Sequence, residues 1–403
     1  MRLLRTPTFG PLLAGQAVNA IGNWVALVAV WGIAAFRFDA GAGDLALLLV
    51  VLSVPGVVLG PFLGLPIDRL GPRRTLILAN GLGLANALTL TQARSYAAVM
   101  VLAIPLGLVE ALASASLDAL PPRLVADEDL VQANALLGGA DDLAVVVGPA
   151  VAAVVNSRWG LSGAFLADAL TFLVGLGAAL RLRAGLADPD ARRSAAWVDL
   201  GEGAALARRT PEVAWTLAVA AVTYGLWALF AILEPLYVRD VLGRSDTVFA
   251  LLQSVFGVGL VGAGLALAGL GDRMARPRYV ALATVASGGT AALYLGTRSL
   301  VVAAVGVFLW GVDVAFFYVP AKTLLQRHTP AAAHGRIMSI NQTLEPLATL
   351  VMSPIAAVMV GVVGVRALGV VGGLIAAAAG LVALHLGRRL GARPVDDSAP
   401  RAQ

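Results

Sequence analysis

The sequence predicts an all-α membrane protein with twelve transmembrane helices in two pseudo-symmetric six-helix bundles. Three observations lead to this fold class. The composition is unusually apolar, the apolar residues form runs of membrane-crossing length, and a pattern of charged and small residues in the first half of the chain recurs in the second half.

Composition alone places the chain in lipid. Apolar residues make up 59% of the 403 residues and charged residues 13%, which is about half the charged share of an ordinary globular protein. The mean hydropathy is +0.85. A chain with so few polar groups needs lipid around it. A cytosolic enzyme and a nucleic-acid-binding domain are therefore excluded, although the formal net charge is +5.

Residue usage also excludes several kinds of chemistry. The chain has no cysteine, so it has no disulfide bond and no thiolate metal site. Its one lysine, Lys322, follows Ala321, so the phosphate-binding pattern GxxxxGK[ST] does not occur. We therefore expect no enzymatic activity, no cofactor and no bound metal.

The predicted helices follow from the apolar runs, because a helix needs about twenty apolar residues to cross a bilayer. The twelve runs lie at 12–34, 45–67, 75–93, 97–119, 133–155, 161–182, 213–238, 247–270, 279–297, 299–321, 337–361 and 365–387. They divide the chain into an N-terminal bundle (1–183), a cytoplasmic linker (184–212), a C-terminal bundle (213–387) and a disordered tail (388–403).

The linker is the longest polar stretch between two runs. Helical spacing relates Trp197, Leu200, Ala204 and Ala207 within it. This spacing is compatible with a short helix on the inner membrane surface, its arginines facing anionic lipid. A solvated linker with one buried tryptophan explains the same residues.

The basic residues orient the predicted helices. With both termini in the cytoplasm, 22 of the 29 basic residues fall at the inner ends of the runs and 7 at the outer ends. Such an inside excess of arginine and lysine is typical of multi-pass proteins of the cell membrane. The frequent use of arginine and alanine indicates a bacterial source with GC-rich DNA.

An internal repeat relates the two halves. An offset of 204 residues carries Asp68 to Asp272, Arg123 to Arg327 and Asp141 to Glu345, and one residue more carries Gly148-Pro149 to Ser353-Pro354. Two parallel six-helix halves joined by a central loop are a transporter architecture, with a substrate site between the halves near the middle of the membrane.

The loop between runs two and three resembles the signature loop of the major facilitator superfamily. The matching residues are Gly64, Asp68, Arg69, Gly71 and Arg73, and a weaker copy follows run eight at Asp272-Arg273. The likeness covers the chain from end to end. Within the superfamily it is closest to the macrolide-efflux branch of drug exporters, on the stretches Leu3-Leu4-Arg5, Pro121-Pro122, Gln132-Ala133-Asn134, Phe165-Leu166-Ala167-Asp168 and Gly335-Arg336.

The resemblance implies a conformational gate at these loops. Asp68 is expected against the amino-terminal end of run eleven, near Gly335 and Arg336, where exposed backbone amides attract a carboxylate. The gate residues would be Gly64, Asp68, Arg69, Gly71, Arg73, Asp272, Arg273 and Arg336. The alternative is that the arginines set only the membrane orientation.

Acids within the apolar runs are candidates for proton coupling, because a carboxylate inside a bilayer needs a partner, water or a function. The candidates are Glu110, Asp313, Asp141, Asp142 and Glu345, with Glu110 and Asp313 ranked first. The alternative is that some of them pack helices or lie in water near the inner surface. Asp118 and Glu234 are expected to be wet because they lie near the ends of their runs. Asp168 resembles a helix-packing acid of the family.

Aromatic and amide side chains are candidates for the substrate cavity. They are Asn23, Trp24, Tyr224, Trp227, Gln253, Phe256, Trp310, Phe317 and Asn341. Such a lining suits bulky amphiphiles rather than sugars or phosphates. Gly148 and Pro149 are predicted to bend run five and resemble the antiporter motif of exporters; ordinary small-residue packing would explain them as well.

These features together predict a secondary active transporter that exports amphiphilic small molecules by alternating access, with proton antiport. Its partners would be the small-molecule substrate, protons and the lipid bilayer, and the protein is expected to be a monomer that binds no nucleic acid. A siderophore exporter and a lysophospholipid transporter of the same superfamily are the alternatives. A non-transporting sensor or scaffold would have no reason to keep cavity acids and a signature loop.

Overall fold

The computed structural model describes residues 3–59, 64–182, 205–268, 274, 276–330 and 333–391, and these ranges contain helices and no strand. The elements are η1 (Leu3–Arg5), α1 (Phe9–Gly32), η2 (Ile33–Arg37), α2 (Ala42–Leu59), α3 (Gly64–Leu70), α4 (Pro72–Leu90), α5 (Tyr96–Asp118), α6 (Pro121–Leu124), η4 (Asp127–Asp129), α7 (Leu130–Arg181), α9 (Pro211–Leu236), η5 (Tyr237–Val241), α10 (Asp246–Ala268), α11 (Pro277–Gly296), α12 (Leu300–Arg327), α13 (His334–Val363) and α14 (Val365–Gly391).

Every predicted apolar run falls largely on helical residues, and the run 45–67 covers parts of both α2 and α3, with residues 60–63 outside the described ranges. The runs 133–155 and 161–182 share α7, whose backbone leaves the helical conformation at Gly160 (φ 68°). Within the described ranges nine helices are long and apolar enough to cross a membrane; α2 is shorter and α4 is not among the nine. The all-α class of apolar helices is confirmed, and the count of twelve crossings stays a prediction.

The helices begin and end where local chemistry predicts. Proline occupies the first turn of α4, α9 and α11, where its missing N–H costs nothing. The Ser95 hydroxyl accepts a hydrogen bond from the Ala98 amide and caps α5. Between α11 and α12, the two closest predicted runs, the chain is non-helical from Thr297 to Ser299.

The offset of 204 residues is visible in the backbone itself. The π-helical turns η2 and η5 are 204 residues apart. Asp39 (φ 51°) and Gly243 (φ 61°), which follow them, are 204 apart, and so are Gly160 (φ 68°) and Gly364 (φ 79°). The predicted duplication therefore extends to the irregular positions of the main chain.

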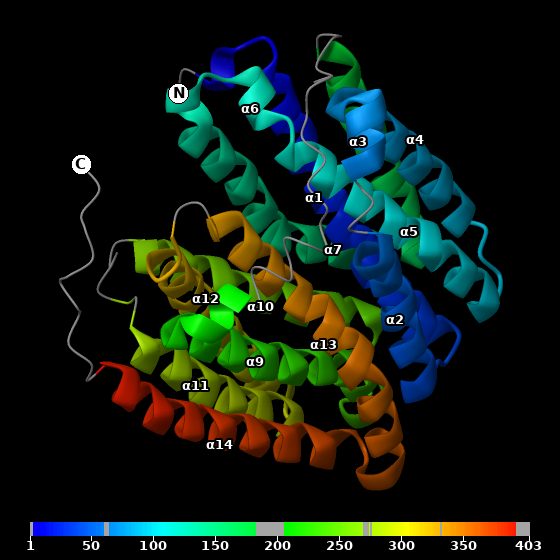
Figure 1. The fold of residues 1–403 in the computed structure, drawn as a ribbon. Helices are drawn as coiled ribbons and strands as arrows, with labels where there is room; N and C mark the ends of the chain where they lie inside the picture. The colour runs from blue at the N-terminus through cyan, green and yellow to red at the C-terminus, as the bar shows by residue number, and fades with distance from the viewer. Residues whose placement is uncertain are drawn as a thin grey trace, which may run out of the picture.

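The helices form two bundles that diverge on one side (Figure 1). The helices α1, α4, α5 and α7 lie in one bundle and α9 to α14 in the other, while α2 packs against α13, and α7 against α10, across the boundary. The described ends of the chain, at η1 and at the end of α14, lie on the side where the bundles diverge. We call this side the terminal side, and the opposite side, which carries η2 and η5, the seal side.

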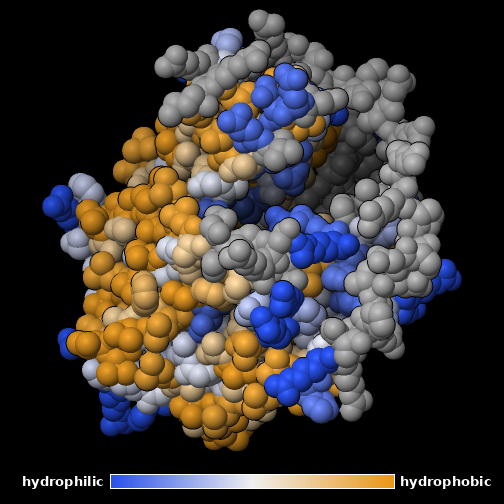
Figure 2. Space-filling model, turned by 90° about the vertical axis from the view of Figure 1, so that its left-hand side faces the viewer, coloured by the Kyte–Doolittle hydropathy of each residue, from blue (hydrophilic) through white to orange (hydrophobic). Residues whose placement is uncertain are grey.

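The surface separates into polar and apolar areas. Hydrophilic residues gather over the middle and right of the terminal side, and hydrophobic residues cover its left flank (Figure 2). On α13, Val358 and Val362 are 67% and 72% exposed. Exposed apolar surface of this extent indicates contact with lipid.

Two predicted segments fall largely outside the described residues. Of the predicted linker, residues 184–204, with Trp197 and Leu200, are not described, whereas 205–209 are helical. α14 continues to Gly391, so the first four residues of the predicted tail are helical; residues 392–403 lie outside the described ranges.

Candidate functional site

A cavity of about 630 Å³ lies inside the first bundle, and polar side chains dominate its wall. α1, α5 and α7 build this wall with Gln16, Asn19, Asn23, Glu110, Ser114, Asp118, Asn134 and Asp141. The α1 residues are spaced by three and four, and the α5 residues by four. These spacings put each set on one face of its helix, and both faces point into the cavity.

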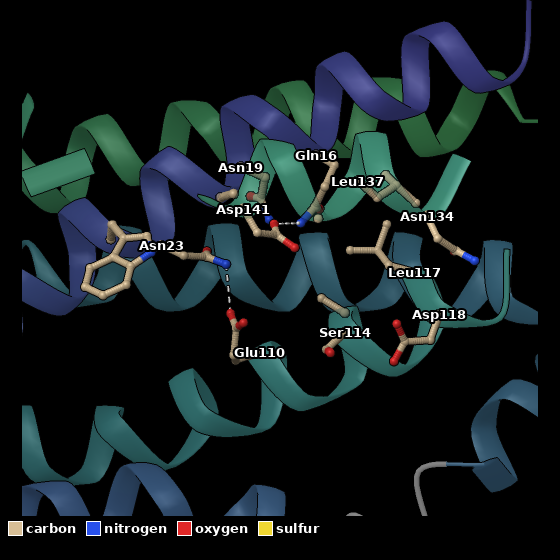
Figure 3. A pocket seen from close by; sticks show the side chains of 14 residues that line it. Gln16, Asn19, Asn23, Glu110, Ser114, Leu117, Asp118, Asn134, Leu137 and Asp141 are labelled. Atoms are coloured by element: carbon tan, nitrogen blue, oxygen red, sulfur yellow. Dashed lines mark hydrogen bonds between the residues drawn. The ribbon is translucent and has the colours of Figure 1, made fainter. Parts of the chain in front are cut away.

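Two hydrogen bonds connect the helices across this polar wall. Asn23 Nδ2 donates to Glu110 Oε2 (2.7 Å), and Gln16 Nε2 donates to Asp141 Oδ1 (3.0 Å), as Figure 3 shows. They join α1 to α5 and α1 to α7. None of the residues found to line this cavity is basic, so the wall offers carboxylates and amides without a cation.

A second cavity, of about 470 Å³, has an aromatic wall from the other bundle. Its lining includes Tyr224, Trp227, Gln253, Phe256, Trp310, Tyr318 and Glu345. The Trp227 ring centroid lies 5.6 Å from that of Tyr224 and 5.3 Å from that of Tyr318. The Tyr318 hydroxyl donates a hydrogen bond to Glu345 Oε2 (2.8 Å). This bond fixes the orientation of Glu345, the acid among the residues found to line this cavity.

The two walls occupy equivalent positions of the repeat. The offset of 204 relates Ala20 to Tyr224, Asn23 to Trp227, Glu110 to Val314, Ser114 to Tyr318 and Asp141 to Glu345. Ser114 and Tyr318 both carry a hydroxyl, and Asp141 and Glu345 both carry a carboxyl. In the other three pairs the two side chains differ in size or polarity. One framework therefore carries an acid and amide wall on one side and an aromatic wall on the other.

The cavities adjoin one another. A third, of about 500 Å³, shares Asn23 and Glu110 with the polar cavity, and Trp24 lines all three. Spaces of several hundred Å³ fit drug-sized ligands. The bundles thus enclose one composite cavity around Trp24, large enough for a bulky small molecule.

On the seal side, Arg239 joins the two bundles. It follows α9 in η5, and its Nη1 donates to the carbonyl oxygens of Ala35 (2.7 Å) and Ala40 (2.9 Å) of the first bundle. The same nitrogen lies 3.0 Å from Asp39 Oδ1. Its Nε lies 2.6 Å from Asp240, which holds the guanidinium in this orientation.

Aromatic stacking closes the space beneath Arg239. Phe249 of α10 stacks on Trp31 of α1 (ring centroids 6.3 Å apart, planes at 12°) and also contacts Phe36. We call Arg239, its partners Ala35, Asp39 and Ala40, and this aromatic group the seal. The polar cavity extends the other way, to Asp118 at the end of α5 and Asn134 at the start of α7, on the terminal side.

Three of the five proton-coupling candidates line the composite cavity: Glu110 and Asp141 in the polar wall and Glu345 in the aromatic wall. Asp142 is exposed on α7, within electrostatic range of Lys322 of α12. Asp313 is not among the residues found to line the three cavities, and Thr290 of α11 donates a hydrogen bond to it (2.8 Å).

A shift of one residue separates Glu110 from Asp313. The position equivalent to Glu110 is Val314, which lines the aromatic cavity, and Asp313 precedes it. One residue turns a helix by about 100°, which is enough to move Asp313 from the cavity to the α11–α12 interface.

Most predicted substrate residues lie in the cavity lining: Asn23, Trp24, Tyr224, Trp227, Gln253, Phe256 and Trp310. Phe317 is fully buried behind Tyr224 and Trp227, and Asn341 is partly buried with its Oδ1 unpaired. Neither is among the residues found to line these cavities.

The predicted bend position brings two helices into close contact. Gly148 lies so close to Trp24 that a Cβ would overlap its side chain, so the glycine allows α7 to approach α1. α7 continues through Pro149, and its backbone leaves the helical conformation at Gly160, between runs five and six. The bend at Gly148 and Pro149 stays a prediction.

The predicted gate is described only in part. Asp272 and Arg273 lie outside the described residues, as does the side chain of Asp68. Gly64 begins α3, which carries Arg69, and Gly71 (φ 81°) begins the turn into α4 in a conformation that favours glycine. Arg73 donates to the Leu180 carbonyl (3.1 Å) within its own bundle, at the end of α7. Arg336 is half-buried near the start of α13.

Several cavity residues were not predicted. Gln16 and Asn19 lie with Asn23 on one polar face of α1, and their spacing of three and four residues could have predicted that face from the sequence. Asp118 and Asn134 lie where the polar cavity reaches the terminal side. Asp168 is fully buried against Gly22 and Thr171, as a helix-packing acid would be. The expectation that Glu234 is wet is wrong, because its exposed fraction is 5%.

The apolar helices, the duplicated bundles and the enclosed cavity define a membrane transporter of small molecules. The profile of the Major Facilitator Superfamily matches residues 12–344 and 215–402. The chain belongs to this superfamily, and it is a multi-pass membrane protein and not an enzyme.

Three relatives are similar over most of their length. An uncharacterised transporter of the same superfamily, YfiS of Bacillus subtilis (strain 168), is 23% identical over 94% of this chain and 93% of its own. Macrolide efflux protein A of Streptococcus pyogenes is 24% identical over 88% and 90%. The lysophospholipid transporter LplT of Yersinia pestis (strain Pestoides F) is 27% identical over 73% of each chain.

Solved structures share the fold. A bacterial homologue of the human lysosomal transporter Spinster, in an inward-facing and unoccupied conformation, superposes with a TM-score of 0.77 and 13% identity over 95% of this chain and 98% of its own. A point mutant of the nucleoside transporter NupG gives a TM-score of 0.77 with 11% identity over 94% and 99%. At these identities the likeness concerns the fold alone.

Proposed function

We propose that the protein exports amphiphilic small molecules across the cell membrane of a bacterium by alternating access, with protons moving in the opposite direction. The observation that carries this proposal is the composite cavity, which has an acid and amide wall on one side and an aromatic wall on the other. It is closed at the seal and extends to the terminal side.

The two walls together favour an amphiphile. Rings such as Trp227 and Tyr224 offer large apolar faces that also attract cations. Opposite them, Glu110 and Asp141 offer negative charge and hydrogen-bond acceptors. A molecule with a bulky apolar body and a basic or hydroxylated group would be complementary to both walls, whereas a sugar or a phosphate would find too few polar partners or no cation.

The distribution of arginine favours the terminal side as the cytoplasmic one. The conformation would then be inward-facing, with the polar mouth at Asp118 and Asn134 receiving substrate from the cytoplasm. Export requires the other state, in which the seal opens and the terminal side closes. The gate predicted at Asp68, Arg69, Arg73 and Arg336 would act in that closure, within a monomer.

Proton coupling is assigned to the cavity acids. Glu110 accepts a hydrogen bond from Asn23, and Asp141 accepts one from Gln16, yet neither has a basic partner in the cavity lining. Bound proton and bound cation would neutralise the same carboxylate, so each would displace the other. This competition gives antiport without any direct contact between the two cargoes.

The relatives support export of an amphiphile and also suggest a second candidate. One relative is named for macrolide efflux and another for lysophospholipid transport, and both cargoes have an apolar body and a polar part. Transport of a lysophospholipid is therefore the alternative, favoured by the 27% identity to the Yersinia protein.

Purified protein in proteoliposomes would test the proposal. A radiolabelled macrolide and a radiolabelled lysophosphatidylethanolamine are offered in separate experiments, with and without an imposed pH gradient. We expect the macrolide to accumulate against its gradient when protons flow the other way. Transport of the lysophospholipid alone would select the alternative, and movement of neither cargo would contradict both.

A further inference from the structure

Glu234 is a buried acid that the proposed coupling by cavity residues leaves unused. It lies on α9 one residue before Pro235, beside the seal, and its exposed fraction is only 5%. A charged carboxylate in such a place is costly unless a cation or a full set of hydrogen bonds compensates it. Its neighbours therefore decide what it can do.

Two polar neighbours approach the Glu234 carboxyl from different helices. They are Gln253 of α10 and Tyr294 of α11. Both are neutral, and in this conformation Oε1 of Glu234 and the hydroxyl of Tyr294 are buried without a well-aligned hydrogen bond. Two neutral neighbours therefore offset only part of the cost of burying the charged form of Glu234, and a bound proton would remove the rest.

Gln253 connects this buried acid to the cavity. Its side chain lines the aromatic cavity, as does Ala231, one turn before Glu234 on α9. The carboxyl is therefore one side chain away from the space that extends to the terminal side. A proton leaving Glu234 has a short route to cavity water past Gln253.

The seal lies on the other flank of Glu234. Tyr237 of η5 packs edge-on against Tyr294 (ring centroids 5.3 Å apart) and donates its hydroxyl to the Thr297 carbonyl (3.0 Å). Arg366 of α14 lies within electrostatic range of Tyr237. Because η5 also carries Arg239, opening the seal would move the turn whose Tyr237 packs on Tyr294, the neighbour of Glu234.

We propose that Glu234 is a proton-carrying residue that is loaded from the seal side and unloaded through Gln253 into the cavity. With the seal open, the carboxylate binds a proton from outside water. With the seal closed, the carboxylic acid releases that proton to water in the cavity. This proposal rests on the proposed function and adds a second proton site to it. Glu110 would bind protons directly in the cavity, whereas Glu234 would bind them next to the seal.

Transport by the Glu234→Gln variant in proteoliposomes would test this assignment. Two readouts are compared with a radiolabelled macrolide: accumulation driven by a pH gradient, and exchange of labelled for unlabelled macrolide without a gradient. Glutamine keeps the shape and cannot carry the proton. We expect at least a tenfold loss of gradient-driven accumulation with exchange within twofold of the wild type.

The matched control is Glu212→Gln, the same change at the other end of α9. It should leave both readouts unchanged, and Glu234→Asp should restore part of the gradient response. Unchanged accumulation in Glu234→Gln would overturn the assignment. Loss of exchange together with accumulation would overturn it too, since it would indicate a structural or binding role.

The same experiment separates this assignment from the proposed function. Wild-type protein that exchanges the macrolide but ignores the pH gradient would contradict proton coupling as a whole. Wild-type protein that responds to the gradient, with a Glu234→Gln variant that responds equally, would overturn only the role of Glu234.

Discussion

Replacing Arg239 by glutamine removes a charged polar link between the bundles on the seal side. The wild-type guanidinium donates to the carbonyls of Ala35 and Ala40, and only 19% of the Arg239 side chain is exposed. A hydrogen bond from a charged group contributes about 1.5–3 kcal/mol when buried. Glutamine keeps one donor group, and water competes at this edge.

The net loss is therefore estimated at about 2 kcal/mol for the sealed conformation. The ion pair with Asp39 adds little, because that carboxylate is 89% exposed and exposed pairs contribute roughly 0–1 kcal/mol. A change of about 2 kcal/mol alters a two-state equilibrium about thirtyfold. The population with an open seal should rise by that factor.

Cysteine labelling measures this population directly, because the natural chain contains no cysteine. Ala231→Cys places a thiol in the cavity next to the seal. A membrane-impermeant thiol reagent added on the seal side reaches it only when the seal is open. In the Arg239→Gln background we expect the labelling rate to rise about thirtyfold.

The control is Arg244→Gln, the same substitution at an exposed position five residues further along. It should leave the rate within about twofold of the parent, since exposed single charges contribute little. An unchanged rate in Arg239→Gln, or an equal rise in Arg244→Gln, would refute the view that Arg239 holds the seal.

Three further outcomes are expected. Asp39→Gly should change the rate of seal-side labelling less than threefold. Glycine relieves the strain of the left-handed backbone at this position, roughly 1 kcal/mol, and the ion pair that the variant loses is exposed. Gly257→Val should abolish transport in the vesicle assay, because a Cβ there would lie 2.6 Å from the Val145 carbonyl oxygen across the bundle boundary; normal transport would show that the boundary can widen. Glu110→Gln should reduce gradient-driven macrolide accumulation at least tenfold, whereas Asp313→Asn, at the α11–α12 interface, should reduce it less than threefold. The reverse order would return the coupling role to Asp313.

The sequence was sufficient for the repeat and for much of the site. The offset found on three pairs of charged residues also relates backbone features that no side-chain pattern reveals, such as Asp39 with Gly243. Glu110 and Asp141 were predicted as candidate acids because each interrupts an apolar run, where an uncompensated acid is conspicuous. The amides of α1 stand out less, since asparagine and glutamine carry no charge.

The remaining errors have a geometric cause. Glu110 and Asp313 lie on corresponding helices, but two residues on corresponding helices share a face only if their positions in the repeat are equivalent. Asp313 is one residue away from the position equivalent to Glu110, and this shift turns its side chain away from the cavity. Glu234 was expected to be wet because its apolar run ends soon after it. The chain instead continues through the π-helical turn η5, and side chains from two other helices, Gln253 of α10 and Tyr294 of α11, lie against the carboxyl.

The way Arg239 binds its partners has a consequence for mutational tolerance. Its two acceptors across the boundary are peptide carbonyls of Ala35 and Ala40, which every amino acid supplies. Changing either alanine leaves the acceptor in place as long as the π-helical turn keeps its shape. The polar part of the seal is thus insensitive to side-chain identity at Ala35 and Ala40 and depends on one guanidinium, whereas its aromatic part still needs the rings of Trp31, Phe36 and Phe249.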